Sequence, residues 1–201
     1  MADADPRRRR SSKVMPLPEC VALVLQGGGA LGSYQAGVYE ALCEAAIEVD
    51  WVAGISIGAI NAAIIAGNPP ERRVPRLRQF WEGATAELPS FPFWPGDLGR
   101  EWLHEWSAGF IALAGAPGFF RPRPVPPTFA APGTAGALSF YDSAPLARTL
   151  DELVDWDLVN DGRVRLSVGA VEVESGNFHY FDSRDERLDA RHVMASGALP
   201  P

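Results

Sequence analysis

The chain has 201 residues, of which 47% are hydrophobic and 21% charged, and it contains 20 glycines and 18 prolines. This is the composition of a globular protein, and it excludes a disordered, collagen-like or coiled-coil chain. The 25 acidic residues outnumber the 18 basic ones, giving a formal net charge of −7. That balance argues against a general nucleic-acid-binding protein, which would present a basic face.

The first residues are polar and basic and contain several prolines, so we expect a flexible basic leader over residues 1–18. The run Arg7–Arg10 within it fits a solvated tail or a contact with anionic lipid. Cys20 and Cys43 form neither a disulfide framework nor a zinc site, and we expect both to be small buried residues. With no signal peptide and no run of ~18 apolar residues, the sequence predicts a cytoplasmic protein.

After the leader, strands and helices alternate, which predicts an α/β fold with a parallel sheet and right-handed crossovers. The first strand is a continuous apolar run, typical of a strand buried on both faces. The expected elements are a strand over 21–25, a glycine loop over 27–32, a helix over 33–46, a strand over 49–55, and helices over 57–66 and 71–82.

Residues 87–138 interrupt this pattern with many prolines and with the tryptophans Trp94, Trp102 and Trp106. A segment of this length without regular patterning is usually functional or disordered, and the aromatic residues argue against simple disorder. We interpret it as an insertion, and two interpretations stay open: a lid that faces lipid, or an excursion packed on the surface.

Regular patterning returns after the insertion. The spacing predicts a helix with Ser143 at its N-cap, a strand, a hairpin that turns at Gly176-Asn177, and a final helix or loop. Their expected bounds are 144–154, 164–171, 178–181 and 189–196.

The stretch Gly54-Ile55-Ser56-Ile57-Gly58 has the form of a nucleophile elbow. A serine at a sharp turn from strand to helix is held in a strained backbone conformation, and the flanking glycines remove side chains that would clash across the turn. The hydroxyl then stands at the carboxyl edge of the sheet, over a helix N-terminus that favours negative charge. The pattern indicates Ser56 as a candidate nucleophile.

A second motif, of the form GxGxxG at Gly27, Gly29 and Gly32, precedes the elbow. A dinucleotide-binding loop would need an acid at the carboxyl end of the second strand, whereas Asp50 lies at the start of that strand. A P-loop would end in Lys followed by Ser or Thr, which this loop lacks. An oxyanion hole is the remaining interpretation, because consecutive glycines expose unhindered backbone N–H groups beside the elbow.

Three runs of the sequence resemble the bacterial patatin-like phospholipases. They are LQGGGALGSYQAGV at 25–38, GISIGAINA at 54–62 and VMASGALPP at 193–201. The resemblance covers residues 20–201 and implies a three-layer α/β/α fold around a mainly parallel sheet, incomplete at the C-terminus. It also implies hydrolysis of lipid acyl esters by a Ser-Asp dyad, without a catalytic histidine, a metal or a cofactor.

By this resemblance Ser56 is the nucleophile, and the backbone N–H groups of Gly28 and Gly29 form the oxyanion hole. Many family members carry a basic residue in this loop, whereas Ala30 and Leu31 are apolar here. Stabilisation of an oxyanion would therefore depend on backbone amides and the helix dipole.

The family's catalytic aspartate lies in an Asp-Gly-Gly or Asp-Gly-Ala motif beyond the third run, and the sequence ends at Pro201 without one. Asp161-Gly162 lies upstream of the expected place and is expected to form a turn. The base is therefore expected to be absent from this chain, which implies a truncated hydrolase or an inactive chain.

Other functions stay open. A non-catalytic fragment or pseudoenzyme could bind lipid or a partner protein, and an acyltransferase could use an acceptor other than water. A Ser-Asp-His triad is disfavoured because only one strand precedes the elbow, so His104, His179 and His192 are expected to be surface or packing residues. The expected partner is a lipid or another acyl ester, with peripheral membrane contact left open.

Overall fold

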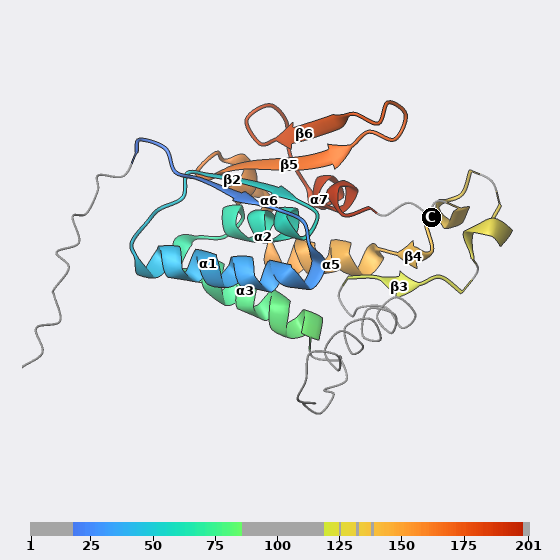
Figure 1. Ribbon diagram of the computed structural model, residues 1–201, viewed down its shortest axis with the longest axis horizontal. Helices are drawn as coiled ribbons and strands as arrows, with labels where there is room; N and C mark the ends of the chain where they lie inside the picture. The colour runs from blue at the N-terminus through green and yellow to red at the C-terminus, as the bar shows by residue number, and fades with distance from the viewer. Residues whose placement is uncertain (1–17, 86–118, 125, 132, 138, 199–201) are drawn as a thin grey trace, which may run out of the picture.

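The computed structural model describes residues 18–85, 119–124, 126–131, 133–137 and 139–198 (Figure 1). Residues 1–17 of the expected leader and 87–118 of the expected insertion, with its three tryptophans and His104, lie outside the described residues. The boundaries of leader, domain and insertion stay predictions.

A four-stranded sheet forms the centre of the described chain (Figure 1). Its strands, in spatial order, are β1 (Ala22–Leu25), β2 (Trp51–Ile55), β5 (Arg165–Val171) and β6 (Phe178–Asp182). The first three run parallel, and β6 returns antiparallel through the predicted hairpin. The expected mainly parallel sheet and the expected adjacency of the first two strands are confirmed. A separate two-stranded sheet pairs β3 (Arg121–Pro122) with β4 (Tyr141–Asp142).

The four helices predicted outside the insertion are present, with bounds that differ by a few residues, and the segment expected to be a helix or a loop over 189–196 forms a helix. These helices are α1 (Gly32–Glu44), α2 (Ile57–Ala66), α3 (Pro70–Thr85), α5 (Ala144–Leu153) and α7 (Ala190–Ser196). The sequence analysis missed α6 (Trp156–Asn160) and three short 3-10 turns, η1 (Gly29–Leu31), η2 (Pro127–Phe129) and η3 (Ala135–Ala137). Elements of three to five residues are too short to show a helical period.

One local expectation holds only in part, and another is wrong. Ser143 stands at the N-cap of α5, but its side chain makes no capping bond, and the carboxylate of Asp142 accepts the N–H of Ala144 instead (3.1 Å). Cys20 and Cys43 are exposed, not buried. Cys43 lies in the last turn of α1, which is mostly exposed. Tyr39, one turn earlier, is buried in the core.

The core lies between the sheet and α2, whose residues are all buried. A helix that is apolar on every side must be enclosed by other elements. Figure 1 shows α1, α2, α3 and α5 on the same side of the sheet, with α2 next to the strands and α1 and α3 outside it. The nucleophile candidate precedes α2 directly, so it sits at the end of the most enclosed helix of the described chain.

The opposite face of the sheet is open. Val24 of β1 is 78% exposed, and Phe178 and Tyr180 of β6 are 63% and 60% exposed. The expectation that the first strand is buried on both faces is therefore wrong. The three-layer expectation is therefore not met within the described residues, whose helices cover one face only. The α/β class and the mainly parallel sheet hold.

Polar side chains on the open face link three strands. Trp51 donates from its indole Nε1 to the Ser167 hydroxyl (2.8 Å), and that hydroxyl donates to the Asp182 carboxylate (2.6 Å). Arg165 donates to the same carboxylate from Nε (2.9 and 3.0 Å) and lies over the Trp51 ring, 4.2 Å from its centroid. The cluster satisfies a buried carboxylate and fixes β2, β5 and β6 to one another.

We expect acid to weaken the fold through Asp182. Burial favours its neutral form, but hydrogen bonds from Arg165, Ser167 and the N–H of Arg184 outweigh burial and lower its pKa below 3.8. A lowered folded-state pKa contributes stability that is present above the unfolded value and is lost as pH falls through the folded value. The stability advantage of wild type over Asp182→Asn should therefore shrink below about pH 4. Urea unfolding of both proteins from pH 7 to pH 3 measures it, and parallel curves would contradict it.

Candidate functional site

Ser56 lies in a sharp turn where β2 ends and α2 begins. Its backbone has φ 56° and ψ −124°, and Ala46 is the other non-glycine residue with positive φ in the described part of the chain. Such a conformation costs an L-residue free energy and persists only where the surroundings impose it. The turn therefore has the strained geometry expected of a nucleophile elbow.

Gly54 and Gly58 are required by the close approach of α2 to the sheet. A Cβ atom on Gly54 would lie 2.3 Å from the carbonyl oxygen of Gly58, and one on Gly58 would lie 2.2 Å from the carbonyl oxygen of Leu25. Both distances are far below van der Waals contact with backbone atoms that cannot turn away. The two motif glycines therefore let the elbow close against β1.

The glycine loop follows β1 and lies beside the elbow because β1 and β2 are parallel neighbours. A Cβ atom on Gly27 would lie 3.4 Å from the Cβ of Ser56. Gly28 and Gly29 have φ 147° and 56°, conformations that favour glycine. Within the described residues no hydrogen bond uses the N–H of Gly28. The loop thus places backbone without side chains next to Ser56.

A buried side-chain amide joins the glycine loop to α2. Asn61 of α2 is 1% exposed; its amide nitrogen donates to the Gly32 carbonyl (2.9 Å) and to Oε1 of Gln35 (3.0 Å). Gln35 in turn donates to the Gln26 carbonyl (2.7 Å), and Trp81 donates its indole N–H to Oδ1 of Asn61 (3.1 Å). The sequence analysis did not identify Asn61 as a site residue. The signal was present, because Asn61 is the one polar side chain in α2.

We expect Asn61→Leu to destabilise the fold. The substitution removes the amide that donates to the Gly32 carbonyl and to Gln35, and loss of a hydrogen bond to a buried polar group costs roughly 1–3 kcal/mol. Asn177→Leu in the exposed β5–β6 turn is the matched control and should change stability little. Urea midpoints measure both, and an Asn61→Leu midpoint equal to that of the control would contradict a stabilising role for the Asn61 hydrogen bonds.

No carboxylate or imidazole in the described ranges hydrogen-bonds to the Ser56 hydroxyl. Asp161-Gly162 forms the expected turn, in which the Asp161 carboxylate accepts the Arg163 N–H (3.0 Å). His192 accepts the Asp189 N–H at Nδ1 (3.0 Å) in the capping box of α7, and His179 is exposed beside Phe181. These two histidines are packing and surface residues, as expected. The described part of the chain has no group of three or more His, Cys, Asp or Glu side chains that could hold a metal ion.

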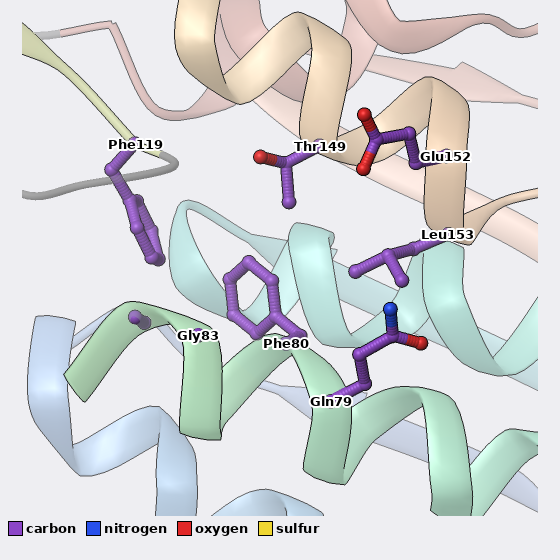
Figure 2. Close-up of a pocket in the computed structure, with 8 residues that line it drawn as sticks. Gln79, Phe80, Gly83, Phe119, Thr149, Glu152 and Leu153 are labelled. Carbon is purple, nitrogen blue, oxygen red and sulfur yellow. The ribbon is translucent and has the colours of Figure 1, made fainter. Parts of the chain in front are cut away.

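A pocket of about 250 Å³ lies between α3, α5 and Phe119 (Figure 2). Phe80 and Leu153 give it apolar lining, and Glu152 and Gln79 give it polar groups. A second pocket lies along α1 and α3, and Ser33 is among its lining residues. Neither is lined by Ser56, so neither is assigned to the elbow. No helix that the structure describes is both long and apolar enough to cross a membrane.

Comparison with known proteins places the chain in a family. The family model described as patatin-like phospholipase matches residues 23–201. Patatin-like phospholipase domain-containing protein 7 of Mus musculus is 43% identical over 70 residues, which is 34% of this chain and 5% of that protein. Lysophospholipase nte1 of Aspergillus terreus is 56% identical over 46 residues, which is 23% of this chain and 3% of that protein. The matched stretches thus span a small fraction of these relatives' length.

Among solved structures, VipD from Legionella pneumophila aligns over 91% of this chain and 43% of its own, with a TM-score of 0.47 and 18% identity. The two curated relatives come from an animal and a fungus, so a specifically bacterial affiliation stays a prediction. Because the family model matches most of the described residues, this chain belongs to the patatin-like phospholipase family.

Proposed function

We propose that the protein hydrolyses acyl esters of lipids with Ser56 as the nucleophile. The observation that carries the proposal is the strained conformation of Ser56 at the N-terminus of a buried helix, with the glycine loop against it. Membership of a phospholipase family also supports the proposal, because a strained serine at such a turn suits ester hydrolysis.

In the proposed reaction, the Ser56 oxygen attacks the ester carbonyl carbon and its proton passes to a base. The carbonyl oxygen becomes an oxyanion that the N–H groups of Gly28 and Gly29 and the positive end of α2 stabilise. Collapse of this intermediate breaks the ester C–O bond, the base returns its proton to the leaving alcohol, and the acyl group stays on Ser56. Water then hydrolyses the acyl-enzyme and restores the serine.

By resemblance to the family, the base is an aspartate that forms a dyad with Ser56. No carboxylate among the described residues hydrogen-bonds to the serine hydroxyl. The same observation favours a second candidate function, a non-catalytic chain that binds lipid or a partner protein, because serine without a base is a weak nucleophile.

Fatty-acid release from phosphatidylcholine vesicles tests the two candidates. Hydrolysis predicts free fatty acid from wild type and none from Ser56→Ala, with both proteins equally folded. Co-sedimentation with the same vesicles tests peripheral membrane contact separately. Wild type that sediments with the vesicles and releases no fatty acid would overturn the hydrolase proposal and support the non-catalytic candidate.

A further inference from the structure

A second serine touches the elbow from a distant part of the chain. Ser196, the last residue of α7, accepts the backbone N–H of Ser56 at its hydroxyl oxygen (2.8 Å), across 140 residues of sequence. The same hydroxyl donates to the carbonyl oxygen of Gly169 (2.5 Å) in β5. One side chain therefore holds the nucleophile's backbone and the neighbouring strand together.

The hydroxyl stands where the ladder between β2 and β5 ends. Ile55 and Gly169 are the last paired residues of these strands. The next N–H along β2 belongs to Ser56, and Ser196 bridges it to the Gly169 carbonyl. A bridge of this kind satisfies both backbone groups while the chain leaves the sheet and turns into α2.

We propose that Ser196 is a positioning residue that holds Ser56 in the conformation needed for attack; this inference rests on the proposed function. The strained φ of Ser56 must be imposed by its surroundings. The glycine contacts allow the turn, but the bond from Ser196 fixes the direction of the Ser56 N–H and hence the place of its side chain. Without the bond, the backbone can relax and carry the hydroxyl away from the glycine loop.

The competing explanation is that Ser196 only stabilises the fold. Ser183 provides a matched control, because its half-buried hydroxyl also accepts a backbone N–H of the sheet, that of Leu166 (3.0 Å), at the opposite end of β5. Each of the two alanine substitutions removes one hydroxyl that accepts a backbone N–H. That N–H belongs to Leu166 in the case of Ser183→Ala and to Ser56 in the case of Ser196→Ala. A purely structural role predicts the same consequences for both.

The experiment measures kcat and KM for p-nitrophenyl butyrate hydrolysis, thermal unfolding, and amide hydrogen exchange by NMR in wild type, Ser196→Ala, Ser196→Thr and Ser183→Ala. We expect Ser196→Ala to lower kcat by about 10- to 100-fold with little change in KM, because a small displacement of a reacting group has effects of this size. Ser196→Ala should also speed exchange of the Ser56 amide. Ser196→Thr, which keeps the hydroxyl, should restore both, and Ser183→Ala should change neither.

Two results would overturn the inference. One is Ser196→Ala with wild-type kcat and unchanged exchange at Ser56; the other is an equal loss of kcat in Ser183→Ala. Failure of the proposed function looks different: wild type would then show no hydrolysis at all, while Ser196→Ala would still speed exchange of the Ser56 amide.

Discussion

Gly58→Ala is expected to prevent the chain from reaching its native fold. The added methyl group would lie 2.2 Å from the carbonyl oxygen of Leu25 and 2.8 Å from that of Gln26. The Leu25 oxygen cannot retreat, because Leu25 belongs to β1, which is paired with β2 along its whole length. Ordinary overpacking costs about 1–3 kcal/mol, and a clash between two backbones should exceed that range.

Gly37→Ala is the matched control for this substitution. Gly37 lies inside α1, and a Cβ there would meet no heavy atom within 4 Å. Alanine in a helix interior is favoured over glycine by roughly 0.5–1 kcal/mol, so the control should be slightly more stable than wild type. Urea unfolding followed by circular dichroism compares the two variants. A cooperative Gly58→Ala transition near that of the control would contradict the close approach at the elbow.

Ser56→Ala and Ser56→Gly are expected to abolish hydrolysis, with a loss of at least about 10³-fold, while the chain stays folded. They should differ in stability. Alanine keeps the strain of φ 56°, whereas glycine adopts that conformation freely, so Ser56→Gly should gain about 1 kcal/mol over Ser56→Ala. Ser56→Gly would thus stabilise the chain while it removes the proposed nucleophile.

Ala46→Gly separates the backbone effect from the chemical one. Ala46 has φ 55°, nearly the value of Ser56, and follows α1 in an exposed position away from the elbow. Its replacement by glycine should stabilise the chain by a similar amount, about 1 kcal/mol, and leave hydrolysis unchanged. Thermal melts and ester hydrolysis of the four proteins test this. Hydrolysis by Ser56→Ala at the wild-type rate would contradict the role of Ser56.

Much of the fold follows from local sequence patterns. A continuous apolar run predicted β1, although its expected burial on both faces is wrong, and the alternation of strands and helices predicted the order of β1, β2 and β5. Gly176-Asn177 predicted the hairpin into β6 because its residue types suit a tight turn. The glycines at 54 and 58 predicted a tight elbow, for which the structure gives the steric reason.

The parts that could not be predicted depend on contacts between distant segments. Ser196 and Ser56 are 140 residues apart, and nothing in the third run alone shows that its hydroxyl reaches the elbow. The same holds for Asp182, whose role depends on the register that sets it opposite Ser167. The exposure of Cys43 depends on where the core ends beneath α1, which helical periodicity does not report.

Labelling with a fluorophosphonate probe, followed by peptide mapping, tests the central claim most directly. The probe forms a covalent bond with an activated serine, so the account predicts one adduct per chain, on the peptide that contains Ser56, and no adduct in Ser56→Ala. Folded wild-type protein that takes up no probe, or that carries the adduct on another serine, would contradict the assignment of Ser56 as the nucleophile.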